Sequence, residues 1–393
     1  MSTVTSTNEV AVLLGELVGI PSPNPDGDTR VIARFIERWM EQEVGARVVR
    51  VAPPEKPEAE SVIARVGNGD GPVVMLHAHI DTVPVGSTEA QAWESDPFQP
   101  CIRDGRVYGK GAVDDKGVLA AMMCAMRRTR DVVASAGTVV LVAAAEEEVG
   151  GRLGTRWLSD NGYLPTSDFI VVGEQTDNLA GGAHKGVMRA SVTVRGRSTH
   201  ATNPDRGVSA INAMARIVIA LEAYHRDLQH RSHPLVGSPT CNVGTITGGS
   251  TTNAVPDKCT ITIDRRMIPR EDFGAVREEL RSVVAAVDVA PAEVEVHGFL
   301  TSSWFESDLD SAPGKAFLDA IARVKGRQVQ PVGYLPGSDA KHLFDVARDG
   351  MVVFGPGTYE VAHAANEYVP VAALEESEAI LVSFLNCLYQ RGS

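Results

Sequence analysis

The 393-residue sequence lacks the features that define several large classes of protein. Its few cysteines are scattered without CxxC spacing, so neither a disulfide framework nor a thiolate zinc site is predicted. The first residues have neither the basic start nor the apolar stretch of a secretory signal, and no apolar run reaches the length of a membrane span. We therefore expect a cytoplasmic protein without membrane contact, in which histidine and carboxylate groups would bind any metal.

Basic residues are outnumbered by acidic ones. The chain has 37 Lys and Arg against 50 Asp and Glu, for a formal net charge of -13. Binding to nucleic acid or to an anionic membrane needs clustered Lys and Arg, and no such cluster is present in the sequence. The charge argues against a general nucleic-acid or anionic-membrane binder and does not exclude a local basic pocket.

The pattern of apolar residues predicts two domains, as expected for a chain longer than one core supports. Near-continuous apolar strands alternate with helices in residues 1–181 and 298–393, which predicts an α/β fold with a mostly parallel sheet flanked by helices. Residues 182–297 instead alternate polar and apolar residues, with two long helices between the strands. We predict a discontinuous catalytic domain and an inserted α+β domain.

The stretch HAHIDTVP, residues 77 to 84, follows the apolar run VVML. On a strand alternate residues share a face, so His77, His79 and Asp81 should project the same way. They stand at the carboxyl end of the strand, where open α/β sheets bind ligands. Taken alone, the pattern indicates only a hydrogen-bonded strand end, so a site would need partners from elsewhere.

Four more segments carry acidic or imidazole groups after an apolar strand or beside a glycine: GKGAVDDKG (109–117), VLVAAAEEEVGG (140–151), VVGEQT (171–176) and FGPGTYEVAHAANEYV (354–369). Each alone is typical of a turn or a solvated surface. Carboxylates brought together would repel strongly unless cations lay between them. Histidine and carboxylate ligands without cysteine suit catalytic zinc, or cobalt or manganese. Two such metals roughly 3.5 to 4 Å apart activate water for hydrolysis.

In the order and spacing of these motifs, over essentially the whole chain, the sequence resembles a di-zinc metallopeptidase and deacylase family. That family includes acetylornithine deacetylase, succinyl-diaminopimelate desuccinylase, aminoacylase and glutamate carboxypeptidase. The resemblance implies a zinc-exopeptidase-like catalytic domain with two divalent metal ions. It also implies that the insert is a dimerisation and lid domain, so we expect a homodimer.

The resemblance gives roles to the first two motifs. HxD implies His79 as a metal ligand and Asp81 as the carboxylate that orients it, whereas His77 stands where the family uses no ligand. The glycine-rich motif implies Asp114 as the residue that bridges the metals, with Asp115 as a neighbour only.

The remaining motifs complete the implied site. EEEVG aligns with the family's DEEVG, which implies Glu147 as the general base and Glu148 as a ligand. VVGEQT resembles the family's GEPT and implies Glu174, and AHAANEYV matches AHxxNE and implies His363. The implied ligand sets are His79, Glu174 and Asp114 for one metal, and Glu148, His363 and Asp114 for the other.

The inserted segment also resembles the family. RGRSTHATNPDRGVSAINA contains His200, which by resemblance enters the partner subunit's active site and stabilises the oxyanion. GGSTTNAVPDKCTITIDRR resembles a substrate-carboxylate clamp and implies Asn253 and Arg266, whose side chains suit that task. The alternative for these three is a loop histidine and strand-surface polar groups. His225, His230 and His233 are predicted to be solvated surface residues.

The activity implied is metal-dependent hydrolysis of an amide bond in a small carboxylate-bearing substrate. Deacylation of an N-acyl amino acid is the leading prediction. A carboxypeptidase or dipeptidase, or a C-N hydrolase of a catabolic or aromatic compound, remains an alternative. A non-catalytic binding protein would be expected to lack the base or a ligand, and every such position is filled here.

Overall fold

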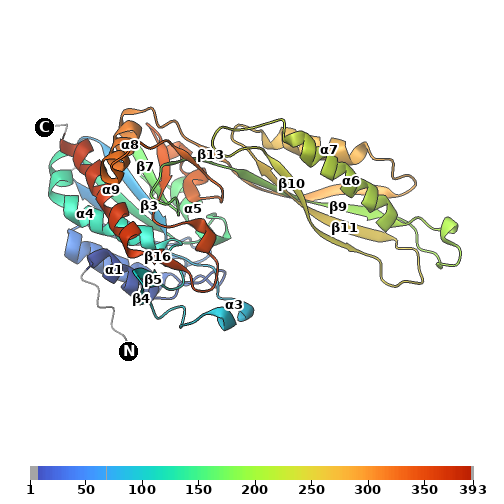
Figure 1. The fold of residues 1–393 in the computed structure, drawn as a ribbon, viewed down its shortest axis with the longest axis horizontal. Coiled ribbons are helices and arrows are strands. Elements are labelled where there is room, and N and C mark those ends of the chain that lie inside the picture. Colours follow the sequence, from blue (N-terminus) through green and yellow to red (C-terminus); the bar gives the residue numbers. More distant parts are fainter. Residues whose placement is uncertain (1–7, 68, 391–393) are drawn as a thin grey trace. The chain divides into compact units, whose positions relative to one another are not determined.

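A computed structural model describes residues 8–67 and 69–390 (Figure 1). The chain divides into two compact units, the first comprising Met1–Gly182 and Ser307–Ser393 and the second Ala183–Glu306. The sequence-based boundary at 297 falls inside strand β12 (Glu293–Ser302), which pairs with β9 (Gly186–Arg195) on both sides of an irregularity between His297 and Leu300. Because all of β12 belongs to the sheet of unit 2, the chain leaves that unit later than the pattern of residues indicated.

The large sheet of unit 1 has parallel strands at its centre. Strand β3 (Val73–His79) lies between β6 (Thr138–Ala144) and β7 (Phe169–Gly173) and runs parallel to both, and β15 (Met351–Phe354) runs parallel to β7. Every residue of β6 and β7 is buried, as expected for strands covered on both faces. The sheet continues with β1 (Arg47–Val51) and β2 (Ser61–Gly67) beyond β6, and with β8 (Gly181–His184) and β14 (Val332–Tyr334) beyond β15. The last strand on this path, β13 (Phe305–Glu306), belongs to unit 2 by its residue numbers.

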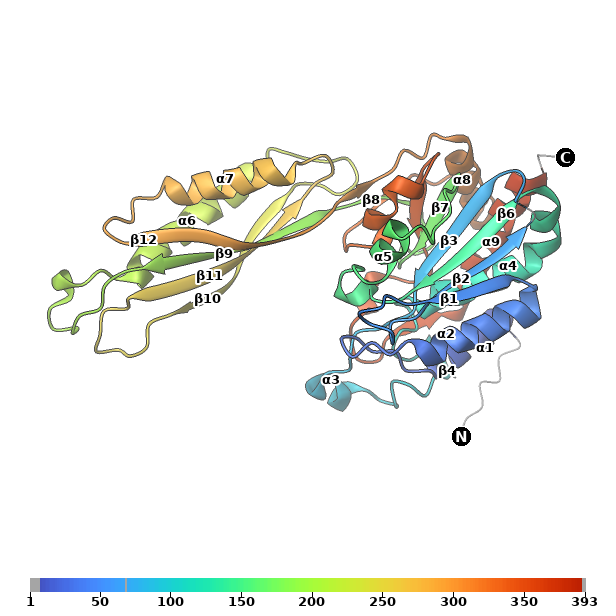
Figure 2. The same cartoon turned by 180° about the vertical axis from the view of Figure 1, so that it is seen from behind.

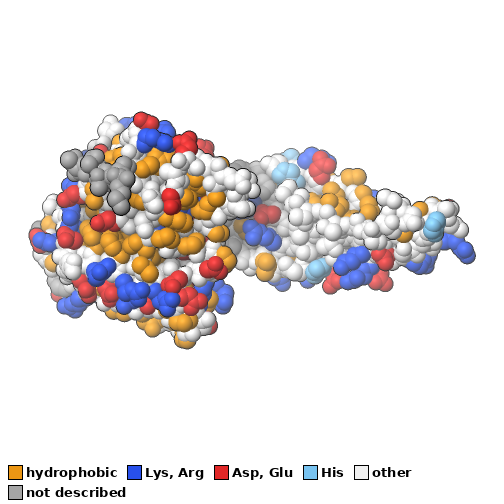
Figure 3. Space-filling view, turned by 90° about the horizontal axis from the view of Figure 1, so that it is seen from below, with side chains coloured by type: hydrophobic (Ala, Val, Ile, Leu, Met, Phe, Trp, Pro, Cys, Tyr) orange, Lys and Arg blue, Asp and Glu red, His pale blue; other side chains and the backbone are white. Residues whose placement is uncertain are grey.

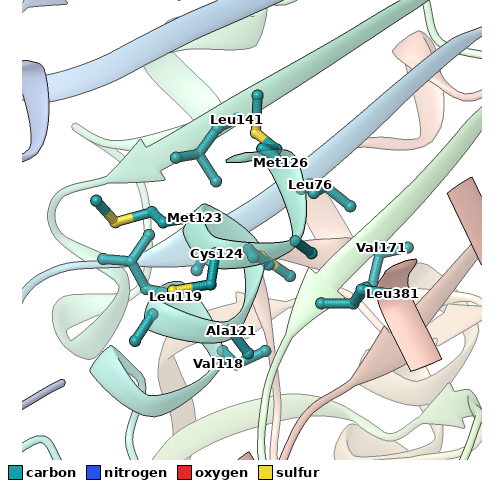
Figure 4. Close-up of a cluster of buried hydrophobic side chains, with 14 of the residues drawn as sticks. Leu76, Val118, Leu119, Ala121, Met123, Cys124, Met126, Leu141, Val171 and Leu381 are labelled. Carbon is teal, nitrogen blue, oxygen red and sulfur yellow. The ribbon is translucent and has the colours of Figure 1, made fainter. Parts of the chain in front are cut away.

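Helices α4, α8 and α9 cover one face of this sheet (Figures 1 and 2). In the core, Val118, Leu119, Ala121, Met123, Cys124 and Met126 of α4 pack with Leu76, Leu141, Val171 and Leu381 (Figure 4). Each large apolar side chain buried in this way contributes about 1.5 to 3 kcal/mol. The helices of unit 1 are α1 (Glu9–Val18), α2 (Arg30–Trp39), α3 (Ser87–Ala92), α4 (Lys116–Ala136), α5 (Thr155–Asp160), α8 (Ala312–Lys325) and α9 (Val371–Gln390). A smaller sheet contains β4 (Cys101–Arg103), β5 (Arg106–Tyr108) and β16 (Tyr368–Pro370).

Unit 2 is a four-stranded antiparallel sheet with two helices on one face (Figure 2). The strand order is β10-β11-β9-β12, where β10 spans Thr240–Gly248 and β11 spans Lys258–Met267. Helices α6 (Ala210–Leu228) and α7 (Phe273–Ala285) begin at Ser209 and Asp272, whose side chains accept backbone N–H groups of the first turn. The unit has its own apolar core, separate from that of unit 1.

The surface of unit 1 carries charges of both signs. On the face seen in Figure 3, basic and acidic side chains are interspersed around a hydrophobic area. Within the residues that the structure describes, no helix combines the length and apolar character that crossing a bilayer requires.

Candidate metal centre

Four segments that are distant in the sequence meet at the carboxyl edge of the parallel strands. His79 ends β3, the glutamates 146–148 follow β6, Glu174 follows β7, and His363 lies in the segment after β15. Asp114 lies just before α4. Because parallel strands end at one edge of the sheet, this topology gathers side chains from separate motifs.

Asp114 lies between two imidazoles. Its Oδ1 is 2.9 Å from His79 Nε2, and its Oδ2 is 3.1 Å from His363 Nε2. Burial disfavours the charged carboxylate, but hydrogen bonds with His363 and His79 outweigh burial and lower the pKa of Asp114. Glu148 Oε2 is 3.1 Å from the same His363 Nε2. His79, Asp114 and Glu148 each offer one donor atom within 4.8 Å of the others, close enough for a common metal ion.

Three glutamates lie in or beside this group, of which Glu174 is buried and Glu147 and Glu148 are partly exposed. Burial raises the pKa of Glu147 to about 7, although the Lys341 ammonium opposes the shift. Burial and the charge of Asp114 raise the pKa of Glu148. Burial, with the charges of Asp114 and Glu147, raises the pKa of Glu174 well above its ordinary value. The ionised forms are therefore unfavourable here without a nearby cation.

The donor set fits divalent metal ions. Imidazole nitrogens and carboxylate oxygens are present, and no cysteine belongs to the group of donors found in the described residues. Such ligands are typical of catalytic zinc sites and also suit cobalt or manganese. A cation would compensate the clustered carboxylates, whose repulsion otherwise favours retained protons.

Glu174 is fixed by two neighbours that the sequence motifs did not identify. The Tyr334 hydroxyl donates to Glu174 Oε2 at 2.7 Å, and the Gln175 side-chain amide donates to the same oxygen at 3.2 Å. Gln175 is the residue that replaces the proline of the related GEPT motif, so the replacement adds a hydrogen bond to the carboxylate. Tyr334 lies in β14, and the segment GSDA (Gly337 to Ala340) follows it closely in the chain.

A cavity of about 240 Å³ adjoins the acidic group. Acidic side chains and His363 form part of its wall, and two tyrosines, a proline and an alanine supply apolar surface. Gly337 of the GSDA segment also lines it. The full lining is Asp114, Glu147, Glu148, Glu174, Gln175, Tyr334, Pro336, Gly337, Tyr359, Ala362 and His363.

The carboxylate of Asp81 supports the acidic loop more directly than it supports His79. It is fully buried and accepts the backbone N–H groups of Glu147 at 3.2 Å and Glu148 at 3.1 Å, and the Asn24 amide at 2.5 Å. The second ring nitrogen of His79 lies 3.0 Å from the backbone oxygen of Asp81 but 3.6 Å from its carboxylate. Asp81 therefore contacts His79 chiefly through its main chain.

Two residues of this region have strained backbones. Glu146 has φ 72° and His363 has φ 57°, values in the left-handed region that side-chain-bearing residues rarely adopt. Such conformations cluster at functional sites, where the surrounding structure compensates for them. Glu146 itself is held by Lys56, whose ammonium lies 2.6 Å from its carboxylate, and not by the group around Asp114.

His77 and Asp115 lie outside the group of donors. The ring of His77 is buried 2.7 Å from the Thr155 hydroxyl, and burial lowers the pKa of His77 to about 4. Asp115 accepts the backbone N–H of His79 at 3.2 Å, so it supports the strand end.

The candidate residues of the insert lie in unit 2. His200 is exposed and pairs through its backbone with the segment of Asn253, since the Ala201 N–H donates to the Asn253 carbonyl at 2.9 Å. Arg266 lies on β11, half-exposed, and its guanidinium contacts Asp264 at 2.7 Å. Its neighbour Arg265 is instead fully buried against Glu271.

The prediction for His233 was wrong. Its side chain is only 11% exposed and lies 3.1 Å from the Glu306 carboxylate, so it is not a solvated surface residue. The loop that contains it folds back, with His233 and Gly237 exchanging backbone hydrogen bonds. The local sequence around His233 could not predict this contact, because Glu306 is distant in the chain.

The chain matches a known family and curated relatives over most of its length. Residues 75–386 match Peptidase family M20/M25/M40. The chain is 31% identical over 328 residues to an acetylornithine deacetylase of Myxococcus xanthus, with 81% of each chain covered. It is 26% identical over 397 residues to a probable succinyl-diaminopimelate desuccinylase of Staphylococcus epidermidis, with 93% of this chain and 94% of the relative covered.

Solved structures share the fold. An M20 family metallo-carboxypeptidase from Sulfolobus solfataricus superimposes with a TM-score of 0.77 at 19% identity, covering 98% of this chain and 100% of that one. The Bacillus subtilis YXEP protein, a dinuclear metal-binding peptidase of the M20 family, gives 0.69 at 18% identity and covers 97% and 98%. The similarity confirms the predicted fold class, a mostly parallel sheet flanked by helices with an inserted α+β unit.

Proposed function

The chain belongs to Peptidase family M20/M25/M40, and from this premise we propose that it is a metal-dependent hydrolase of an amide bond in a small carboxylate-bearing substrate. The observation that carries the proposal is the position of Asp114, with one carboxylate oxygen facing each of two imidazoles beside a cavity lined by three glutamates. A carboxylate placed in this way is suited to bridge two cations.

The proposed metal ligands follow from this position. His79, Glu174 and Asp114 would bind one ion, and Glu148, His363 and Asp114 the other. Zinc is the proposed ion, with cobalt or manganese as alternatives that metal analysis distinguishes. When bound, the ions would lower the pKa of a water molecule and polarise the scissile carbonyl.

Glu147 is the proposed general base. Its carboxylate lines the cavity and belongs to neither proposed ligand set, so it is available to handle a proton. It would accept a proton from the attacking water at a carboxylate oxygen and return it to the departing amine. Asp81 would support both glutamates, because its carboxylate accepts the backbone N–H groups of Glu147 and Glu148 and so fixes the main chain of the loop.

Unit 2 is proposed to supply substrate-binding groups. Asn253 and Arg266 would bind the carboxylate of the substrate, since an amide and a guanidinium both donate hydrogen bonds to that group. His200 would stabilise the oxyanion, acting from a second copy of the chain, and this role requires a homodimer. Analytical ultracentrifugation tests that requirement, because a fully active monomer would contradict it.

Deacylation of an N-acyl amino acid is the proposed reaction. Support comes from the curated relatives, an acetylornithine deacetylase and a probable succinyl-diaminopimelate desuccinylase. The test is metal analysis of the purified protein together with a hydrolysis screen of N-acetyl, N-succinyl and N-formyl amino acids alongside dipeptides. We expect metal-dependent release of an amino acid from one N-acyl class. Cleavage of dipeptides alone would favour a peptidase, and no hydrolysis by the metal-loaded protein would contradict the proposal.

A further inference from the structure

A connected set of polar side chains leads from β3 to Glu147. His77 Nε2 lies 2.7 Å from Thr155 Oγ1, and the Thr155 hydroxyl donates to Asp339 Oδ2 at 2.6 Å. Lys341 Nζ lies 3.8 Å from Asp339 Oδ1 and 3.2 Å from Glu147 Oε1. The side chains of His77, Asp339 and Lys341 are at most 5% exposed, and Thr155 is fully buried.

From His77 to Asp339 the hydrogen bonds run in one direction, and Lys341 is a separate donor on the far side of Asp339. A hydroxyl has a single proton, and that of Thr155 is given to Asp339, so the proton between His77 and Thr155 must come from His77 Nε2. Asp339 then accepts from Thr155 with one oxygen and faces the Lys341 ammonium with the other. Hydrogen bonds between buried polar groups are costly to break, so the two bonds that join His77, Thr155 and Asp339 fix the positions of these side chains, although His77 Nδ1 and Asp339 Oδ1 have no hydrogen-bond partner among the described residues.

The acidic loop packs directly on this set. Gly151 ends the loop with φ 70°, and its N–H donates to the Glu146 carbonyl at 2.8 Å. A Cβ at Gly151 would collide with Asp339 Oδ1. The loop that carries Glu147 therefore packs against Asp339 at Gly151, where a larger residue would not fit.

Lys341 is the cation that contacts the proposed base. Among the ion pairs of residues 8–67 and 69–390, it is the only cationic partner of Glu147. It contacts Oε1, which leaves Oε2 as the oxygen for a proton in transit. An ammonium on a flexible stem fixes a carboxylate only if it is itself held, and the Asp339 carboxylate attracts Lys341 at 3.8 Å, as an ion pair without a hydrogen bond.

We propose that Lys341 is a positioning residue that fixes the carboxylate of Glu147 in the orientation needed to accept a proton. Asp339 forms an ion pair with Lys341, and Thr155 and His77 in turn fix the position of Asp339. The inference rests on the proposed function, because the orientation of Glu147 matters only if that residue moves a proton. It also gives a task to His77, which binds no metal in the proposed site.

The test compares Lys341→Met with a matched control, Lys325→Met. Lys325 is also largely buried and pairs with Glu376 at 2.6 Å, in a different part of unit 1. Both variants are assayed on a substrate that the wild-type protein has been found to hydrolyse; if there is none, the proposed function fails before this test begins. We expect Lys341→Met to lower kcat by about 10- to 100-fold, part of the contribution of general-base catalysis, with wild-type KM and metal content. Lys325→Met should keep wild-type kcat.

Thr155→Val gives a second test that changes no charge. It removes the hydroxyl that donates a hydrogen bond to Asp339 and keeps the shape of the side chain. We therefore expect kcat to fall while KM and metal content stay unchanged. It decides the outcome if Lys341→Met does not fold. Wild-type kcat in the folded variants, or a loss of activity fully accounted for by lost metal or by unfolding in a thermal melt, would overturn the proposal.

Discussion

The carboxylate of Asp81 accepts the backbone N–H of Glu147 at 3.2 Å, which ties the end of β3 to the loop after β6. Its second oxygen accepts the N–H of Glu148. An asparagine at this position would turn one acceptor oxygen into a donor facing a backbone N–H. We predict that Asp81→Asn lowers metal affinity or kcat by about 10- to 100-fold, as is usual when a group that supports metal ligands is lost.

Metal titration and steady-state kinetics check this prediction. Asp160→Asn is a suitable control, because Asp160 forms a half-exposed pair with Arg156 on α5 and such pairs contribute little. Equal metal affinity and kcat in Asp81→Asn and in the control would show that the loop does not depend on Asp81.

Glu147→Ala should separate metal binding from turnover. Glu147 lines the cavity but belongs to neither proposed ligand set, so its loss should leave the metal content unchanged. Loss of a general base lowers the rate by about 10²- to 10⁴-fold. Plasma emission spectrometry and kinetics on the same sample measure both quantities. Near-normal turnover would remove Glu147 from the role of base.

His363→Ala should lower the metal content itself. The His363 ring lies 3.1 Å from both Asp114 and Glu148, and hydrogen bonds with these two carboxylates raise the pKa of His363 to about 10 in the metal-free protein. Removing the ring removes a ligand, so less metal should survive dialysis. His230→Ala, an exposed position in unit 2, is the control. Unchanged metal occupancy in His363→Ala would take it out of the ligand set.

The residues of the acidic group could be predicted from the sequence because each belongs to a short motif that resembles one of the family's motifs. The resemblance alone implied a place for Asp114, which precedes α4 and follows no parallel strand. His79 and Glu148 follow parallel strands, which end at one edge of the sheet. The same reasoning places Glu174 and His363 at the edge of the cavity.

The supporting residues could not be predicted in this way. Tyr334 and Lys341 reach Glu174 and Glu147 only through the packing of residues 332–341, and Asn24 reaches Asp81 from a loop before α2. None of these contacts follows from the period of a strand or a helix, because loop packing is set by tertiary contacts. The contact between His233 and Glu306 was missed for the same reason.

Glu174→Gln should have opposite effects on the metal-free and metal-loaded proteins. In the metal-free protein, burial and neighbouring charges raise the pKa of Glu174 far above its ordinary value. At neutral pH folding must then bind a proton or bury a repelled charge, and either outcome costs free energy. Glutamine keeps the shape and an oxygen that can accept from Tyr334, so the metal-free variant should melt at a higher temperature than the metal-free wild type. Each 1 kcal/mol corresponds to about 2 to 4 °C in a domain of this size.

With metal bound, the wild type should melt at a higher temperature than Glu174→Gln. Metal that binds only the folded state stabilises it in proportion to affinity, so zinc should raise the melting temperature of the wild type strongly and that of Glu174→Gln weakly. Differential scanning calorimetry with chelator and with zinc measures all four states. A variant that melts below the wild type without metal, yet gains as much from zinc, would mean that Glu174 is held for packing and is not a ligand. A variant that melts above the wild type without metal and below it with zinc is expected only if the carboxylate cluster destabilises the metal-free protein and binds cations.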